Sequence, residues 1–127
     1  MKKIISSILL TLSTTINIYA SQYICKINDS CDFTTIGWNT VTKTAKLIES
    51  SGKVDIGKVT LSRKHDEGFK VNIDIKHVNH SYRDMSEFII FTVGKEHRVI
   101  GAGFIIKDGK KYLDISYGNH KADCLSL

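Results

Sequence analysis

The chain has 127 residues, which is enough for one core-forming domain and too few for several large ones. Its 18 basic and 13 acidic residues give a net charge of +5, and no run of like charges gathers them in one place. This distribution argues against nucleic-acid binding, which requires a clustered basic surface. Proline is absent, and no linker, repeat or low-complexity stretch divides the chain.

The first 20 residues have the pattern of a secretory signal peptide. Lys2 and Lys3 form a positively charged start, and residues 4–18 are mostly apolar and carry no charge. Ala20 supplies the small residue that a cleavage site requires. The apolar stretch is too short and too polar for a lasting membrane span, and a retained amphipathic anchor is the alternative. We therefore expect cleavage near Ala20 and a bacterial protein that is periplasmic or secreted.

Residues 21–127 are expected to form a single β-rich domain, with 16 basic and 13 acidic residues and a net charge of +3. Its three cysteines predict one disulfide and one odd thiol in an oxidising compartment. If the first and last strands are neighbours, a bridge from Cys25 to Cys124 is favoured, because the stabilisation by a disulfide rises with the length of the loop it closes. Cys31–Cys124 is the close competitor, whereas Cys25–Cys31 is impossible if both lie on one straight strand. Cys31 is therefore expected to be free or the alternative partner.

Apolar and polar residues alternate in three segments, as they do in strands with one buried face. The apolar members, which we expect to point at a common core, are Tyr23, Cys25 and Ile27, then Phe69, Val71, Ile73 and Ile75, and finally Leu113, Ile115 and Tyr117.

Residues 38–50 fit two structures. Trp38, Val41 and Ala45 recur at helical spacing, whereas Val41, Ala45 and Leu47 also fit a strand, which the nearby threonines favour. We predict a strand here and keep one short helix as the alternative.

Two denser apolar runs, 88–93 and 99–106, are rich in β-branched and aromatic residues and predict central strands. Gly101 and Gly103 lie on one face of the second run and indicate a bulge or a strongly bent strand.

Turn signals separate these runs at fairly even spacing. The strongest is Asp108-Gly109, because both residues suit the positive φ of a two-residue hairpin turn. Residues 77–87 are typical of a longer polar loop, where function tends to sit. Short strands joined by short turns predict a mainly β fold, namely a small antiparallel up-and-down β-barrel or sandwich of about 7–8 strands.

No catalytic motif or metal-ligand set stands out in the sequence. His77 and His80 are three residues apart, but a strand or loop does not place them on one face as a helix would. No catalytic signature surrounds Cys31, and the chain has neither a Gly-x-Ser-x-Gly elbow nor a phosphate-binding loop. We therefore expect no enzyme activity, no metal and no cofactor.

Several aromatic and polar residues indicate contact with a partner, because Trp, Tyr and Arg anchor many protein interfaces. The alternative is that Trp38 closes one end of the barrel and that the tyrosines are half-buried strand residues. The predicted partner-binding residues are Trp38, His80, Tyr82, Arg83, Tyr117, Asn119 and His120.

These features together predict an exported, non-enzymatic binding protein that recognises or inhibits another protein through loops at one end of a β-barrel. Size, export, one long-range disulfide and a barrel-like pattern are similar to the general architecture of periplasmic lysozyme inhibitors and small immunity proteins, although their contact motifs are missing. A carrier of a small apolar ligand, with an interior opened by Gly101 and Gly103, is the first alternative. A hydrolase or thiol enzyme is the second and ranks lowest.

Overall fold

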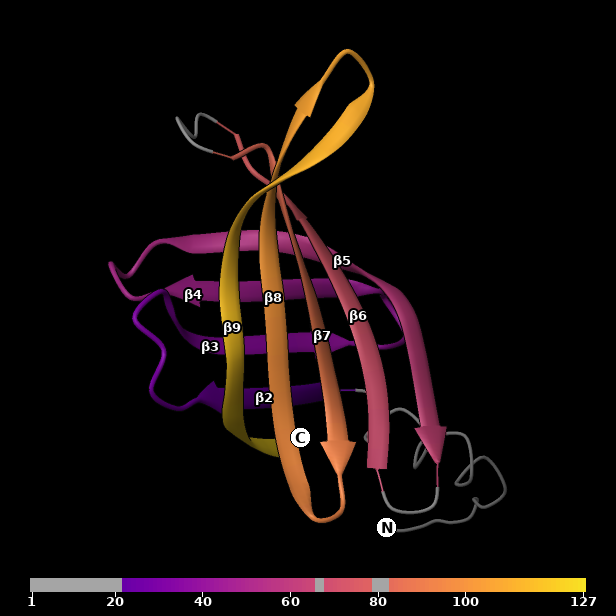
Figure 1. Ribbon diagram of the computed structural model, residues 1–127. Coiled ribbons are helices and arrows are strands. Elements are labelled where there is room, and N and C mark those ends of the chain that lie inside the picture. The colour runs from indigo at the N-terminus through magenta and orange to yellow at the C-terminus, as the bar shows by residue number, and fades with distance from the viewer. Residues whose placement is uncertain (1–21, 66–67, 79–82) are drawn as a thin grey trace, which may run out of the picture.

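The computed structural model describes residues 22–65, 68–78 and 83–127. In this part of the chain, eight antiparallel strands form a closed barrel in which each strand pairs with the next and the last pairs with the first (Figure 1). The strands are β2 (Gln22–Ile27), β3 (Phe33–Asn39), β4 (Thr44–Glu49), β5 (Val54–His65), β6 (Gly68–Lys76), β7 (Met85–Val93), β8 (Glu96–Lys107) and β9 (Lys110–Ser126). The predicted fold class is confirmed in its barrel form.

The described residues contain no helix, so the helical alternative for residues 38–50 is wrong. The predicted strand is correct for residues 38–39 and 44–49 but not for residues 40–43. A turn separates β3 from β4, and the carboxamide oxygen of Asn39 accepts hydrogen bonds from the backbone N–H groups of Val41 (2.8 Å) and Thr42 (3.0 Å). This side chain satisfies the backbone locally and thereby competes with a helix. Lys43 completes the turn with a φ of 61°.

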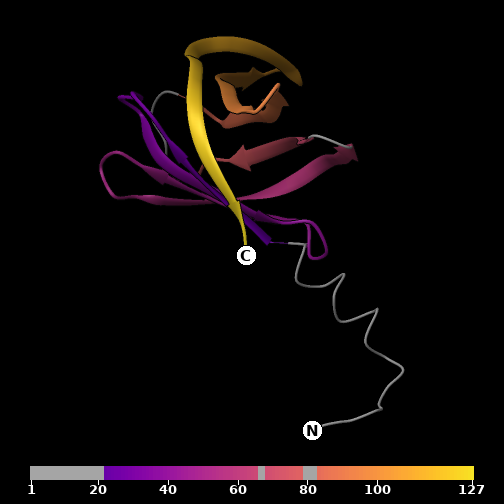
Figure 2. The ribbon, with the colours of Figure 1, turned by 90° about the horizontal axis from the view of Figure 1, so that it is seen from below.

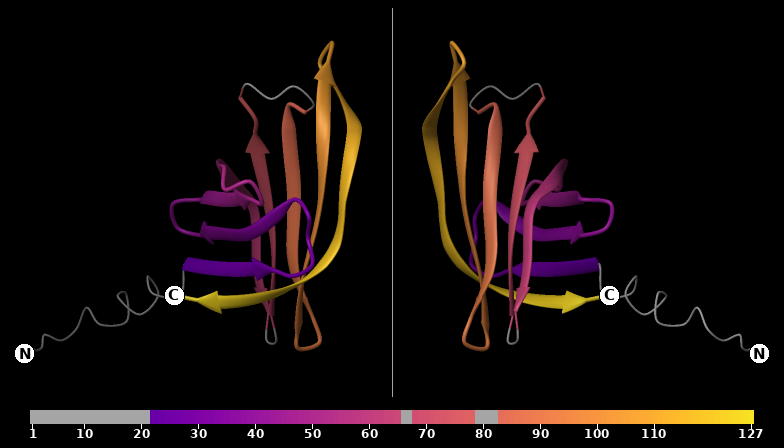
Figure 3. Two further views of the ribbon diagram at one scale, coloured as in Figure 1. Left: turned by 90° about the vertical axis from the view of Figure 1, so that its left-hand side faces the viewer. Right: turned by 90° about the vertical axis from the view of Figure 1, so that its right-hand side faces the viewer.

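The barrel closes through β9. Its first part pairs with β8, whereas its last residues pair with β2. Figures 2 and 3 show β9 leaving the β8 side and curving across to the β2 side. Cys25 and Cys124 lie opposite each other in this last pairing and form a disulfide, as predicted. Cys31 is exposed and free.

The alternation predicted for the first two segments is confirmed. In β6, Val71, Ile73 and Ile75 are buried, and Phe69 packs against the same core. In β2, Cys25 and Ile27 are buried. These side chains meet inside the barrel because residues two apart on a strand share a face.

The third predicted segment is only partly correct. Tyr117 is 5% exposed and belongs to the core, whereas Ile115 is 42% and Leu113 is 66% exposed. Ile115 pairs with Gly103 but Leu113 pairs with Phe104, so that a bulge leaves an extra residue between them. The bulge moves Leu113 to the face opposite to that of Ile115.

The hairpin formed by β8 and β9 also extends beyond the neighbouring strand β7. β7 begins at Met85, opposite Phe104, so β8 and β9 pair only with each other beyond this point. Figure 1 shows the resulting hairpin projecting from the barrel. In β9 the extension comprises residues 110–112, because Leu113 and Ile115 lie opposite Phe104 and Gly103, which still pair with β7.

Gly101 and Gly103 mark irregular pairing with β9, as predicted. A Cβ atom on Gly101 would lie 2.5 Å from Cδ1 of Phe88, and one on Gly103 would lie 2.7 Å from the Tyr117 hydroxyl oxygen. Both glycines are thus required by close packing. The space that they leave is filled by side chains.

No helix in the described ranges is both long and apolar enough to traverse a lipid bilayer.

Candidate functional site

The two ends of the barrel differ in chemistry. At the end where β2 begins and β3 finishes, aromatic rings fill the interior. Tyr23 stacks on Trp38 with ring centroids 5.3 Å apart, and the Phe69 ring lies 5.6 Å from each. Trp38 is 4% exposed. Its side chain therefore closes one end of the barrel, which was the alternative to a role in partner contact.

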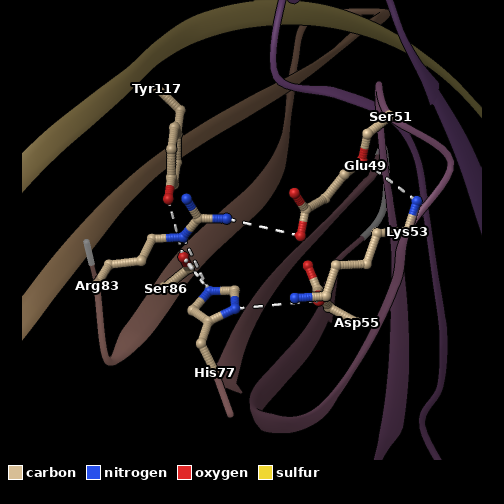
Figure 4. A network of polar contacts seen from close by, with 8 residues as sticks. All are labelled: Glu49, Ser51, Lys53, Asp55, His77, Arg83, Ser86 and Tyr117. Carbon is tan, nitrogen blue, oxygen red and sulfur yellow. Dashed lines mark hydrogen bonds and ion pairs between the residues drawn. The ribbon is translucent and has the colours of Figure 1, made fainter. Parts of the chain in front are cut away.

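The opposite end carries the connections from β2 to β3, β4 to β5, β6 to β7 and β8 to β9. Inside it, polar side chains from four strands and one connection converge (Figure 4). We call this group the polar cluster; its members are Glu49, Asp55, His77, Arg83, Ser86 and Tyr117.

A chain of hydrogen bonds links the cluster. His77 Nε2 lies 2.7 Å from Ser86 Oγ, which in turn lies 3.0 Å from the Tyr117 hydroxyl. Arg83 Nε donates a hydrogen bond of 3.1 Å to His77 Nε2. Because arginine can only donate, His77 Nε2 must be the acceptor, and the proton of the neutral ring is on Nδ1. That nitrogen lies 4.0 Å from Oδ1 of Asp55.

The cluster also holds opposite charges close together. Arg83 Nη2 lies 3.7 Å from Glu49 Oε2, and Lys53 Nζ lies 3.8 Å from Asp55 Oδ1. The Glu49, Asp55 and Arg83 side chains are 15%, 6% and 10% exposed, whereas Lys53 is 46% exposed. The arginine is therefore fixed inside the barrel end, and the lysine reaches in from the surface.

Burial changes the ionisation of the cluster. It raises the pKa of Glu49 to about 7, assisted by a hydrogen bond and charge repulsion from Asp55, and opposed by Arg83 and Lys53. Burial also raises the pKa of Tyr117, against the opposing effects of the Ser86 hydrogen bond and the Arg83 charge. The Glu49 and Asp55 carboxylates thus lie close together where few water molecules reach them. A proton or a cation bound to one of them would reduce their mutual repulsion.

Ser86, His77 and Asp55 follow one another in the order of a nucleophile, a base and an orienting carboxylate. Two observations limit this chemistry. Ser86 is 0% exposed, and Arg83 donates into the Nε2 lone pair that a general base would use. In this arrangement His77 accepts a hydrogen bond from the partly buried Arg83, and the Ser86 hydroxyl is not accessible as a nucleophile.

The predicted partner-binding residues have different locations. Arg83 and Tyr117 belong to the polar cluster, but Trp38 lies at the other end. Asn119 is exposed and accepts a hydrogen bond of 2.9 Å from Arg98, and His120 is half-buried with Nε2 2.7 Å from the Tyr117 carbonyl oxygen. His80 and Tyr82 lie outside the described residues.

Sequence reasoning missed Glu49, Asp55 and Ser86, although the first and last of these carry a signal. Glu49 continues the inward-facing positions of Ala45 and Leu47 in β4, and Ser86 precedes Phe88 at the same spacing in β7. A polar residue at a strand end that keeps the phase of the buried face is expected to point into the barrel end.

Beside the polar cluster, the projecting part of β8 and β9 forms an anchored hairpin. The backbone N–H of Ile106 donates to Oδ2 of Asp84 at 2.7 Å, and the backbone N–H of Asp84 donates to the Phe104 carbonyl at 2.8 Å. Lys111 pairs with Glu87 and lies 4.7 Å above the Phe104 ring. We call residues 104–115 the projecting hairpin.

Among the hollows on the outside of the described barrel, two extend over several strands each. One of about 660 Å³ crosses the outer face from β5 to β9, and one of about 610 Å³ crosses it from β2 to β5. The first contains Asp74 and Glu87, and burial together with the Glu87 charge raises the pKa of Asp74. Core residues contribute to the lining of both, namely Phe88 in the first and Trp38 and Ala45 in the second.

Comparison of the chain with protein-family models, with curated proteins and with solved structures finds no match.

Proposed function

We propose that this chain is a non-enzymatic binding protein that recognises another protein through the barrel end carrying the polar cluster and the projecting hairpin. The observation that carries the proposal is the apolar surface of that hairpin. Ile106, Tyr112, Leu113 and Ile115 are between 42% and 66% exposed. Apolar side chains gathered on one exposed element are typical of interfaces, and tyrosine is among the residues that dominate binding energy.

The anchoring of the hairpin supports the same proposal. Asp84 holds its base through two hydrogen bonds, and the Lys111–Glu87 ion pair holds one side. A surface that is ordered before binding loses less conformational entropy when a partner docks.

The charges around the tip indicate the chemistry of the partner. Lys107 and Lys110 flank the Asp108-Gly109 turn and are exposed. An apolar pocket bordered by acidic residues would complement this tip, because complementary charge steers association and fixes orientation.

The disulfide supports export as part of the proposal, since such bonds persist mainly in oxidising compartments. A protein of this kind would act as an inhibitor or an immunity-like protein outside the cytoplasm. The carrier alternative has weaker support, because Phe88 and Tyr117 fill the space beside Gly101 and Gly103.

The test compares two leucines of nearly equal exposure, Leu113 on the hairpin at 66% and Leu125 near the end of β9 at 67%. A photo-crosslinking amino acid at each position, used in an extract of the producing cells, should give a specific protein adduct at 113 only. With the purified partner, L113E should raise the dissociation constant about tenfold or more, and L125E should leave it unchanged.

Equal adducts at both positions, or equal effects of L113E and L125E, would refute the proposal. A small apolar ligand retained in native mass spectrometry, together with no adduct at either position, would favour the carrier instead.

A further inference from the structure

Three side chains of the polar cluster offer the donor atoms that bind divalent transition metals. Glu49 ends β4, Asp55 lies near the start of β5 and His77 follows β6, and one ligand atom of each lies within 4.8 Å of the others. Figure 4 shows the three side chains facing one another across the barrel end. Carboxylate oxygen and imidazole nitrogen are both ligands of Zn²⁺ and related ions.

The state of Asp55 provides a second, independent observation. Its side chain is 6% exposed, and its Oδ2 atom is buried without a hydrogen bond from any residue that the structure describes. A buried carboxylate oxygen that lacks a donor is energetically costly, so it requires a compensating group. The ammonium of Lys53 lies 3.8 Å from the other oxygen, Oδ1.

We propose that Glu49, Asp55 and His77 bind one divalent transition-metal ion, of which Zn²⁺ is the best matched to two carboxylates and an imidazole. Three protein ligands leave at least one coordination position for water or for a group from a partner. A metal ion would also relieve the repulsion between the Glu49 and Asp55 carboxylates, whose ligand atoms lie within 4.8 Å of each other. This site goes beyond the proposed function, because it requires no partner.

Metal binding requires two rearrangements. Lys53, which is 46% exposed, must swing away from Asp55. If His77 coordinates the metal through Nδ1, the imidazole proton must be on Nε2. The Nε2–H group then donates a hydrogen bond to Ser86 Oγ, which lies 2.7 Å away. Arg83 then cannot donate to Nε2, but it can remain beside Glu49, from which it is 3.7 Å away. Lysine and metal therefore compete for one position.

The test uses isothermal titration with Zn²⁺ in a C31S background, which removes the exposed free thiol of Cys31 as a competing type of zinc ligand. We expect one equivalent to bind, and D55N and H77Q to weaken the affinity by about tenfold or more. D74N is the matched control, because Asp74 also neighbours a second carboxylate, that of Glu87, and it should bind zinc like the parent. K53M should bind zinc several-fold more tightly.

No measurable binding by the parent, or unchanged affinity in both D55N and H77Q, would overturn the proposal. If either variant fails to fold, Mn²⁺ added to the C31S protein provides the second measurement. Paramagnetic broadening should be strongest for the backbone amides of residues 49, 55 and 77, and broadening centred elsewhere would refute the site. Because no partner is present in either experiment, failure here leaves the protein-binding proposal intact.

Discussion

Glu49 is the residue whose ionisation the barrel changes most clearly. On an isolated strand it would be an ordinary surface carboxylate, but here it is the inward-facing residue that follows Leu47 at the end of β4. Asp55, Arg83 and Lys53 act on it from different elements, and His77 lies beside them. Its chemistry is therefore a property of the closed barrel end rather than of its own strand.

We predict that replacing Glu49 with Gln removes a pH dependence of stability. The pKa of Glu49 is raised from 4.5 to about 7 in the folded protein. Between these values the folded chain holds a proton that the unfolded chain has released, so the free energy of unfolding falls as the pH rises. The stabilisation is complete below pH 4.5 and is lost above about pH 7, and the change amounts to roughly 1–3 kcal/mol.

Urea unfolding at pH 5 and pH 8, with a chelator present, measures this difference. The decrease should be smaller in E49Q than in the parent. E96Q serves as the control, because Glu96 is 43% exposed at the surface, and it should decrease like the parent. A parent protein and E49Q with parallel pH profiles would contradict the assignment.

At the scale of elements, the projecting hairpin combines two irregularities. A bulge near Asp114 changes which face Leu113 presents, and β8 and β9 extend beyond the start of β7. Strand pairing alone does not hold this extension against the barrel. Asp84, in the connection before β7, supplies the contact by accepting the N–H of Ile106.

We predict that Asp84→Ala loosens the hairpin while the barrel stays intact. Loss of a charge-assisted hydrogen bond should lower the local opening free energy by about 1 kcal/mol, and amides from 105 to 112 should exchange roughly fivefold faster. Hydrogen–deuterium exchange measures this directly. Asp114→Ala, an exposed change on the same hairpin, is the control and should leave these rates unchanged. Faster exchange throughout the core of D84A would show instead that Asp84 supports the whole barrel.

At the scale of the whole molecule, stability depends on the seam between β2 and β9. These strands come from the two ends of the described chain, so their pairing forms only when the barrel closes. The Cys25–Cys124 bridge spans a sequence separation of 99 residues at this seam. A cross-link of that length removes much of the conformational freedom of the unfolded chain.

We predict that reducing this bridge lowers the free energy of unfolding by about 4.7 kcal/mol, as the chain-entropy relation gives for a loop of about 100 residues. Urea unfolding with and without reductant measures the loss. C31S should unfold like the parent under oxidising conditions, because Cys31 is exposed and takes no part in the bridge. A loss below about 1 kcal/mol would mean that the seam is held by strand pairing alone.

Local rules explain why much of the fold could be predicted from the sequence alone. Period-two burial placed Val71, Ile73 and Ile75 in the core, and the turn between β8 and β9 follows from Asp108-Gly109. Both depend on residues close together in the chain. The favoured disulfide needed one further assumption, that the first and last strands of the domain are neighbours, and the barrel makes them so.

Only the tertiary structure decided the membership of the polar cluster and the exposure of the hairpin. Glu49, Asp55 and Ser86 come from three strands, and they meet because the sheet coils and closes on itself. Leu113 and Ile115 have the alternation of core residues, but the bulge in the pairing of β9 with β8 places Leu113 on the opposite face. A pattern along one strand determines which side chains share a face, whereas other strands determine what that face meets.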